Sequence, residues 1–368
     1  MSTDKRLRSL DVFRGATIAG MILVNSPGNE MAYVPLEHAA WDGCTPTDLI
    51  FPFFVFILGA SLYFSLSNRL AQGTGRAVLF RKVLHRTAAL FGLGLLLNGF
   101  PYYHWSTLRI PGVLQRIALC YFFAATLFLR FRLRTLLYLT LGILLGYWLL
   151  MTRTPVPGFG AGNLTRTGNL AAYVDRTVLA GHLYRPEYDP EGILSTLPAI
   201  ATALMGILAG AWLGSGRSDQ EKLEGLLAAG AAAIVAGKLW GWWFPINKAL
   251  WTGSYVLYAG GWALLLLALC YWLIDVKKRE VWGKSFEIFG RNAILAYCLH
   301  ILFLKIQNLV YLPRPDGRPG NLRFYMTDHF FAPWTTPLNA SLLYALSYTL
   351  FWLIVCGVLS RKKIFVKI

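Results

Sequence analysis

The residues LIFPFFVFILGASLYFSL at positions 49–66 decide the fold class of this chain. They carry no charge, and their number is close to the roughly 20 residues that a helix needs to cross about 30 Å of hydrocarbon. The run LDVFRGATIAGMILV at 10–24 is similar, and the polar segment NSPGNEMAYVPLEHAAWDGCTPTD at 25–48 lies between the two. The sequence therefore predicts two membrane-spanning helices joined by a polar loop at one membrane surface.

The composition extends this prediction to the whole chain. Of the 368 residues, 56% are hydrophobic and only 14% are charged, which is more apolar side chain than a soluble domain can bury. We expect an all-α, polytopic transmembrane bundle that forms a single domain over 1–368. The ten predicted spans lie near 10–27, 47–67, 81–100, 110–129, 135–152, 193–213, 223–244, 253–274, 286–308 and 339–359. The longer connections at 28–46, 153–192 and 309–338 are predicted to be outer loops.

The distribution of the basic residues predicts the topology of the chain in the membrane. The net charge is +17, but the Lys and Arg residues come in short clusters between apolar runs and form no continuous stripe, which argues against nucleic acid as a partner. Alternate connections are rich in Lys and Arg, whereas the 28–46 loop has neither. Basic short loops face the cytoplasm, so both termini are predicted to be cytoplasmic.

The cysteines and histidines predict neither a disulfide framework nor a metal site. Four of the five cysteines lie within apolar runs, and only Cys44 is near the predicted outer surface. The chain has no CxxC or HxxxH spacing of the kind that binds zinc. We therefore expect chemistry that needs no metal.

The first predicted span carries polar side chains on one face. Asp11 and Arg14 are three residues apart, so they can form an ion pair, and a purely structural pair is an equal alternative. Asn25 follows Asp11 by fourteen residues, which returns it to nearly the same face about 21 Å further along. Such a face could lie beside a long, thin cofactor; the simpler alternative is that Asn25 caps the helix.

His38 is the candidate catalytic residue of the first outer loop. Asp48 lies ten residues further on, and a carboxylate that holds one imidazole nitrogen leaves the other free to take a proton, as general-base catalysis requires. We group Asn25, His38 and Asp48 as one site around a helical hairpin. A solvated loop histidine and an N-capping Asp48 are the structural alternatives.

Charged residues at the predicted inner face suggest a site for a phosphate-bearing ligand. Arginine forks suit phosphate, so a nucleotide or pyrophosphate bound there would explain several of them. Anchoring to anionic membrane lipid is the alternative for the exposed ones. The residues assigned to cofactor binding are Arg8, Asp11, Arg14, Arg86, Arg116 and Arg291.

Aromatic, amide and acidic residues gather in the predicted outer connections. Trp and Tyr there are first of all a membrane-interface belt, yet aromatic faces also cover sugar rings while amides and carboxylates hold hydroxyls or an ammonium. We assign these residues to a carbohydrate site: Trp41, Asp189, Glu191, Asn247, Lys248 and Trp251.

Six blocks in order along the chain resemble the heparan-α-glucosaminide N-acetyltransferase family of transmembrane acyltransferases, in particular its compact bacterial members. They are RLRSLDVFRG, HAAWDGCTPTDLIFPFFVFILGAS, LRIPGVLQRIAL, DPEGIL, FPINKALWTGSYVL and GRNAILAYCLH. The resemblance implies transfer of an acetyl group from cytosolic acetyl-CoA to the amine of a glucosamine-type sugar or glycan across the membrane. It also implies that His38 is the catalytic histidine, accompanied by Asn25 and Asp48.

The resemblance carries an expectation about location as well. Only a few residues precede LDVFRG, unlike the eukaryotic pattern, which favours a bacterial inner membrane over a lysosome and puts heparan in doubt as acceptor. The residues leave open whether His38 is a general base or an acetyl carrier. They also leave open a homodimer, an amino-sugar transporter, and an O-acyltransferase acting on polysaccharide hydroxyls.

Overall fold

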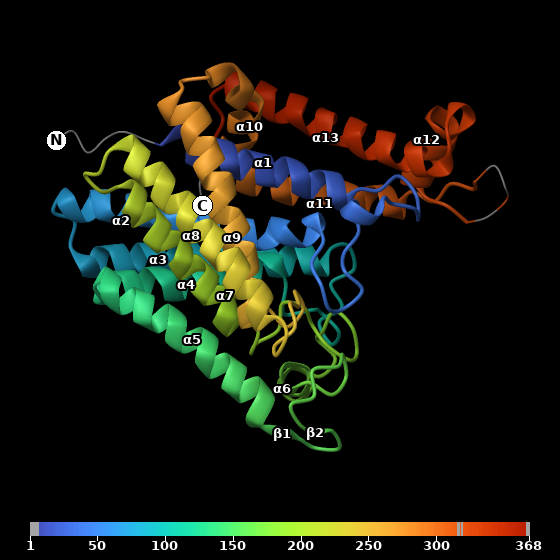
Figure 1. The fold of residues 1–368 in the computed structure, drawn as a ribbon. Coiled ribbons are helices and arrows are strands. Elements are labelled where there is room, and N and C mark those ends of the chain that lie inside the picture. The colour runs from blue at the N-terminus through green and yellow to red at the C-terminus, as the bar shows by residue number, and fades with distance from the viewer. Residues whose placement is uncertain (1–6, 315–316, 318, 366–368) are drawn as a thin grey trace.

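A computed structural model describes residues 7–314, 317 and 319–365 of the chain (Figure 1). Long helices dominate it, as the apolar runs predicted. In order they are α1 (Arg8–Asn25), α2 (Ile50–Ala71), α3 (Arg76–Gly99), α4 (Val113–Arg130), α5 (Leu133–Arg153), α6 (Leu170–Val178), α7 (Thr196–Leu213), α8 (Asp219–Trp240), α9 (Gly253–Cys270), α10 (Glu280–Arg291), α11 (Ala293–Leu309), α12 (Leu322–Phe330) and α13 (Pro337–Arg361). Short helical turns cover Val34–Leu36, Pro46–Leu49 and Ala332–Trp334, and a π-helical turn over Tyr271–Val276 extends α9. The strands β1 (Pro155–Val156) and β2 (Gly160–Ala161) pair antiparallel, with Pro155 opposite Ala161.

The helices confirm the all-α, polytopic class. Seven of them in the described part of the chain are long and apolar enough to cross a membrane: Pro46–Ala71, Val113–Arg130, Leu133–Arg153, Thr196–Leu213, Asp219–Trp240, Gly253–Val276 and Pro337–Arg361. Helices α1 and α3 occupy two further predicted spans and carry more charged residues. The chain is therefore a multi-pass membrane protein.

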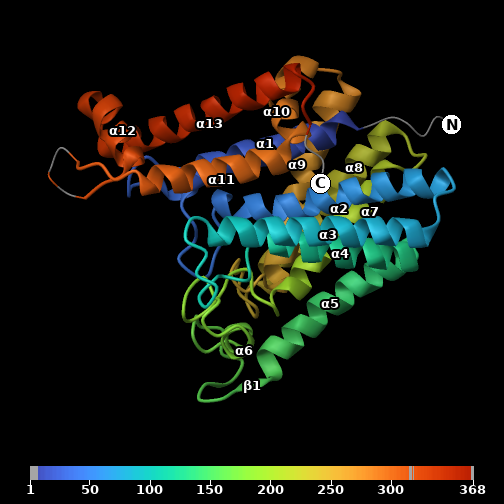
Figure 2. The ribbon, with the colours of Figure 1, turned by 180° about the vertical axis from the view of Figure 1, so that it is seen from behind.

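The ninth predicted span is two helices and not one, so the prediction of a single continuous helix there was wrong. Over 286–308 the chain forms the end of α10 and most of α11, and the segments Gly283–Arg291 and Ala293–Leu309 meet at 80°. Arg291 and Asn292 interrupt the apolar run at the break, but apolar residues lie on both sides, so the sequence was interpreted as one span. Helix α10 lies across the end of the bundle, and α11 runs beside α1 (Figures 1 and 2).

Two glycines allow α10 to lie close to α1. A Cβ added at Gly15 would be 1.6 Å from the carbonyl oxygen of Phe286, and one added at Gly290 would be 1.9 Å from the carbonyl oxygen of Asp11. Small residues permit such close backbone approach between membrane helices. The contact fixes Arg14 and Arg291, the neighbours of these glycines, near one another.

The two ends of the bundle differ. The long loops, with α6, β1, β2 and α12, gather at one end, on the right of Figure 1. The short α2–α3 and α4–α5 turns lie at the opposite end, where α1 begins and α13 ends. The loop-rich end is the one that carries His38.

Candidate active site

Two cavities lie in line along the bundle. The first, of about 680 Å³, is lined by His38, Asp48, Asn25 and residues of the loops; we call it the loop-end cavity. The second, of about 360 Å³, is lined by Arg14, Arg69, Arg86 and Arg291; we call it the arginine cavity. Phe54, Ile117 and Tyr297 line both of them. The two cavities therefore adjoin at these three apolar or aromatic side chains.

The predicted contact between His38 and a carboxylate is confirmed, and the carboxylate is that of Asp48. Nδ1 of His38 lies 2.7 Å from Oδ1 of Asp48. The His38 side chain is 55% exposed and that of Asp48 is 1% exposed, so a buried acid holds a histidine at the cavity surface. This contact engages Nδ1, so Nε2 is the ring nitrogen that remains for other interactions.

The backbone of the 45–49 turn fixes Asp48. Oδ2 accepts hydrogen bonds from the backbone N–H of Ala39 and of Thr45, each at 3.0 Å, and from Oγ1 of Thr45 at 3.1 Å. Thr45 and Asp48 form a capping box at the start of the turn that leads into α2. The structural alternative for Asp48 is thus also correct: one carboxylate caps the helix and holds His38.

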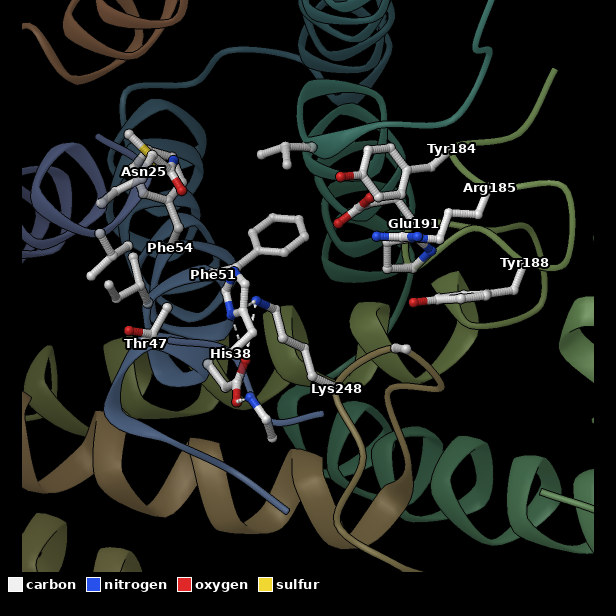
Figure 3. Close-up of a pocket in the computed structure, with 18 of the residues that line it drawn as sticks. Asn25, His38, Thr47, Phe51, Phe54, Tyr184, Arg185, Tyr188, Glu191 and Lys248 are labelled. Carbon is white, nitrogen blue, oxygen red and sulfur yellow. Dashed lines mark hydrogen bonds and ion pairs between the residues drawn. The ribbon is translucent and has the colours of Figure 1, made fainter. Parts of the chain in front are cut away.

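Lys248 reaches the same pair from the loop before α9 (Figure 3). Its Nζ lies 3.1 Å from Nδ1 of His38 and 3.4 Å from Oδ1 of Asp48. Burial lowers the pKa of Lys248, while the nearby Asp48 carboxylate acts in the opposite direction and favours the ammonium. The sequence placed Lys248 in a sugar site; the structure places it against the candidate catalytic histidine.

Asn25 and Trp41 line the loop-end cavity as well. In Figure 3 Asn25 and Phe54 lie on one wall, and His38 and Lys248 at its base. Trp41 donates from Nε1 to the carbonyl oxygen of Leu164 at 3.0 Å, and its ring meets Tyr188 edge-on with centroids 5.3 Å apart. Trp41 is thus held as an aromatic wall on the loop side.

The opposite wall contains an ion-pair network that the sequence anticipated only in part. Arg109 donates to both carboxylate oxygens of Asp189, at 2.9 and 2.7 Å, and to Oε2 of Glu191 at 2.5 Å. Burial lowers the pKa of Arg109, but these two carboxylates raise it more. Asp189 is buried and does not line the cavity, so its assignment to sugar binding is not supported, whereas Glu191 lines the cavity.

Asp175 of α6 supports that wall from behind. Its Oδ1 accepts from the backbone N–H of Ile193 at 2.8 Å. A Cβ added at Gly192 would lie 1.8 Å from Oδ2 of Asp175, so the turn that follows Glu191 requires glycine there. Burial raises the pKa of Asp175 to about 6.

Asn247 and Trp251 were also assigned to sugar binding, and the structure makes both of them structural. Asn247 is fully buried and donates from Nδ2 to Oδ1 of Asp42 at 3.0 Å. Trp251 is 1% exposed and donates from Nε1 to Oγ1 of Thr202 at 3.1 Å. Sequence reasoning missed this because buried and sugar-binding tryptophans look alike in sequence.

Arg116 does not lie at the arginine cavity, contrary to prediction. It is 1% exposed near the start of α4, donates to the carbonyl oxygen of Gly192 at 3.1 Å and to Oγ of Ser195, and stacks over Trp251 at 5.1 Å. Helix α4 begins at the loop-rich end, so a residue one turn into it belongs to that end. Arg116 ties α4 to the turn before α7.

Three of the predicted arginines do line the arginine cavity: Arg14, Arg86 and Arg291. The predicted pair is confirmed, with Nη1 of Arg14 at 3.0 Å from Oδ1 of Asp11. Arg86 stacks over Tyr121 at 4.8 Å, and its buried Nε has no hydrogen-bond partner among the described residues. Arg69, which the sequence analysis did not assign, lines the cavity too.

Arg8 and Asp11 do not line this cavity, so their assignment to cofactor binding is not supported. Arg8 forms ion pairs with Glu287, at 3.0 Å, and with Glu280, both on α10. Glu287 also accepts from Arg291 at 2.5 Å. These contacts attach the start of α1 to α10.

The sequence analysis missed several residues that line the loop-end cavity: Arg109, Arg166, Tyr184, Arg185 and Tyr188. Four of them come from the 153–192 connection, whose fold could not be predicted. Arg166 stacks over Trp41 at 5.5 Å and donates to the carbonyl oxygen of Ala40. Within the described residues, no group of three or more His, Cys, Asp or Glu side chains could hold a metal ion.

These features define a class: a polytopic helical membrane protein in which a carboxylate-held histidine lines a cavity at one end, and an arginine-lined cavity adjoins it. The particular family follows from comparison. Residues 6–238 match the family described as heparan-alpha-glucosaminide N-acetyltransferase, catalytic, and the chain belongs to that family.

Two relatives extend the similarity over the whole chain. The chain is 31% identical to heparan-alpha-glucosaminide N-acetyltransferase from Homo sapiens, over 99% of this chain and 60% of that protein. It is 31% identical to the Mus musculus protein of the same name, over 100% of this chain and 61% of that protein. The chain thus spans about three-fifths of the length of these relatives.

Proposed function

We propose that the protein is a membrane acetyltransferase that moves the acetyl group of acetyl-CoA to the amine of a glucosamine-type sugar or glycan. One observation carries the proposal: the His38–Asp48 pair lines a cavity that adjoins an arginine-lined cavity, with three residues lining both. Family membership supports the reaction class. A donor entering at one end and an acceptor at the other would meet at His38.

The arginine cavity is the proposed site for the phosphates of the donor. Arg14, Arg69, Arg86 and Arg291 present guanidinium groups to it, and guanidinium forks recognise phosphate oxygens. Part of the charge of Arg14 and Arg291 is compensated by Asp11 and Glu287, whereas Arg86 keeps a buried donor without a partner in the described chain. Arg86 is therefore the strongest candidate for a direct phosphate contact.

The proposed chemistry requires a proton acceptor for the sugar amine. Nε2 of His38 takes that proton as the amine nitrogen attacks the thioester carbon, the C–S bond breaks, and the thiolate of CoA receives the proton from the imidazolium. In the alternative route Nε2 first takes the acetyl group itself. Asn25 lines the same cavity and is the proposed hydrogen-bond donor to the oxyanion.

The acceptor would occupy the loop-end cavity. Trp41 and Tyr188 provide aromatic surface for a sugar ring, and Glu191 provides a carboxylate that can hold an ammonium. Arg166 and Arg185 also line this cavity and have no carboxylate partner among the described residues. They leave positive charge available for an acidic group on the acceptor.

The decisive experiment measures acetyl transfer from radiolabelled acetyl-CoA to glucosamine by the purified protein. We expect His38→Ala to lower the rate at least about 100-fold, because general-base catalysis contributes at least that much. The matched control is His104→Ala, since His104 is exposed in another loop and does not line either cavity. Full activity in His38→Ala would refute the mechanism. In a separate assay, uptake of amino sugar into proteoliposomes without acetyl-CoA would instead favour the hypothesis that the protein is a transporter.

We place the protein in a bacterial inner (plasma) membrane, as a single domain with the arginine cavity open to the cytosol. The basic connections between helices support this orientation. A test is the labelling of single cysteines in a cysteine-free variant of intact cells. Tyr102→Cys, at an exposed tyrosine in the α3–α4 connection, should react with an impermeant maleimide, whereas Arg132→Cys, in the α4–α5 turn, should not.

A further inference from the structure

We propose that Lys248 is a positioning residue: its ammonium group disfavours protonation of His38 and so sets the pH range in which His38 can accept a proton. The kinetic consequence rests on the proposed function, but the effect on His38 itself does not. Lys248 would act on the reaction through the histidine and not by binding the sugar.

The geometry fixes which atoms carry the protons. Asp48 accepts from the loop through Oδ2, so Oδ1 is the atom left for the histidine. Nδ1 of His38 at 2.7 Å and Nζ of Lys248 at 3.4 Å both point to that Oδ1. An ionised carboxylate oxygen can only accept, so at 2.7 Å the neutral ring donates Nδ1–H to Asp48 and carries its lone pair on Nε2. Nζ of Lys248 then approaches Nδ1 without a hydrogen bond between the two nitrogens. The 3.1 Å approach of Nζ to Nδ1 then brings a positive charge to the ring.

The turn that carries Lys248 is rigidly held. Its neighbour Asn247 is anchored to Asp42, and the backbone N–H of Trp251 donates to the carbonyl oxygen of Lys248 at 3.1 Å. Trp251 is itself locked in the core by its bond to Thr202. The two buried residues that looked like sugar ligands in the sequence therefore position Lys248 beside His38.

The charged groups around His38 oppose one another. Asp48 favours an imidazolium, and Lys248 disfavours it at a similar distance. Cys44 contributes no charge, since burial raises the pKa of its thiol to about 12. Four further charged residues line the same cavity: Glu191, Arg109, Arg166 and Arg185. The charge of Arg109 is neutralised by its ion pairs with Asp189 and Glu191. Arg166 and Arg185 lie on the loop wall of the cavity.

The size of the effect follows from Coulomb's law. Two unit charges about 3 Å apart at a half-exposed site, with an effective dielectric constant of about 40–80, shift a protonation midpoint by about one to two pH units. In a triad without a lysine the carboxylate alone stabilises the imidazolium. Here Lys248 offsets that stabilisation, so the imidazolium formed during catalysis passes its proton on to the thiolate more readily.

The test titrates His38 without any turnover. Diethyl pyrocarbonate reacts with the unprotonated imidazole, and peptide mass spectrometry reports the rate at His38, with exposed His104 as the reference in the same digest. In Lys248→Met and Lys248→Gln we expect the midpoint pH for modification of His38 to rise by about one to two units, with His104 unchanged. Lys248→Arg should keep the wild-type midpoint, as should the matched control Lys82→Met, whose side chain is exposed on α3. An unchanged midpoint in both neutral variants overturns the proposal.

The pH profile of acetyl transfer adds a second readout. The acid limb of the kcat/KM profile should move to higher pH by the same one to two units in Lys248→Gln. In Lys248→Arg it should lie at the same pH as in the wild-type protein. A uniform loss of kcat/KM at every pH, with the limb in place, would show that Lys248 only binds substrate. Absence of acetyl transfer in the wild-type protein would refute the proposed function, and the modification of His38 would still decide the role of Lys248.

Discussion

Asp48→Asn should separate catalysis from folding at the candidate site. The two oxygens of the carboxylate have different partners. Oδ2 accepts three hydrogen bonds from Ala39 and Thr45, and Oδ1 contacts Nδ1 of His38 and Nζ of Lys248. An asparagine can present its oxygen to only one of these two sets of partners. Presenting its NH₂ to the loop would leave the backbone N–H groups of Ala39 and Thr45 without an acceptor, at a cost of about 0.5–1.5 kcal/mol for each lost bond. The Thr45 hydroxyl could still donate to the carbonyl oxygen of Glu37, which is 2.6 Å away.

The asparagine should therefore keep its oxygen toward the loop and turn its NH₂ toward His38. Nδ1 must then accept a hydrogen bond, so the proton of the neutral ring moves to Nε2, the atom that takes the proton of the amine in the proposed mechanism. The same substitution in a Ser-His-Asp triad costs about 10⁴ in kcat for this reason. We expect a loss of about 10²–10⁴ in kcat here, with little change in thermal unfolding because the loop bonds survive.

The assay compares Asp48→Asn with Asp42→Asn in acetyl transfer to glucosamine and in thermal unfolding in detergent. Asp42 is exposed in the same loop and accepts from Nδ2 of Asn247, a bond that an asparagine oxygen can keep. We expect Asp42→Asn to retain most of the activity. Should folded Asp48→Asn keep more than one tenth of the wild-type rate, the idea that Asp48 sets the tautomer of His38 is wrong.

Three further perturbations address other parts of the protein. The raised pKa of Asp175 means that the folded protein loses about 3 kcal/mol of stability from this group as the pH rises from about 4 to about 6. Asp175→Asn should therefore raise Tm at pH 8 but not at pH 4.5. An equal change in Tm at both pH values would contradict this prediction. Arg86→Gln should raise KM for acetyl-CoA about 10-fold or more, as expected for loss of a charged hydrogen bond, whereas Arg81→Gln, exposed on the same helix, should not. Arg166→Gln should raise KM for an acidic amino-sugar acceptor by up to about fivefold at low salt and leave KM for glucosamine itself unchanged; equal effects on both would rule out recognition of an acidic group.

The sequence predicted the parts of this structure that depend on local patterns. Apolar runs located the long helices because burial in lipid requires about 20 apolar residues in succession. The Asp11–Arg14 pair and the His38–Asp48 pair were also predictable, since helical spacing and a short capped turn bring those residues together.

Residues that depend on distant parts of the chain could not be placed. Lys248 is 210 positions from His38, and no local pattern indicates their contact. Trp251 and Asn247 were misjudged because a polar or aromatic residue in a loop has the same sequence signature whether it binds a sugar or fills a core. Arg116 was assigned to the wrong end because its charge was considered without its position near the start of α4.

The break between α10 and α11 is the least predictable feature and has the largest effect on the proposed passage. It places Arg291, the last residue of α10, and Ala293 and Ile294, the first residues of α11, at the wall of the arginine cavity. The start of α11 therefore adds the positive end of a helix dipole to the guanidinium groups, and both favour phosphate. One turn further on, Tyr297 lies between the two cavities. The broken span therefore joins a proposed phosphate site to a side chain that lines both cavities, and discontinuous helices form the substrate sites of transporters in a similar way.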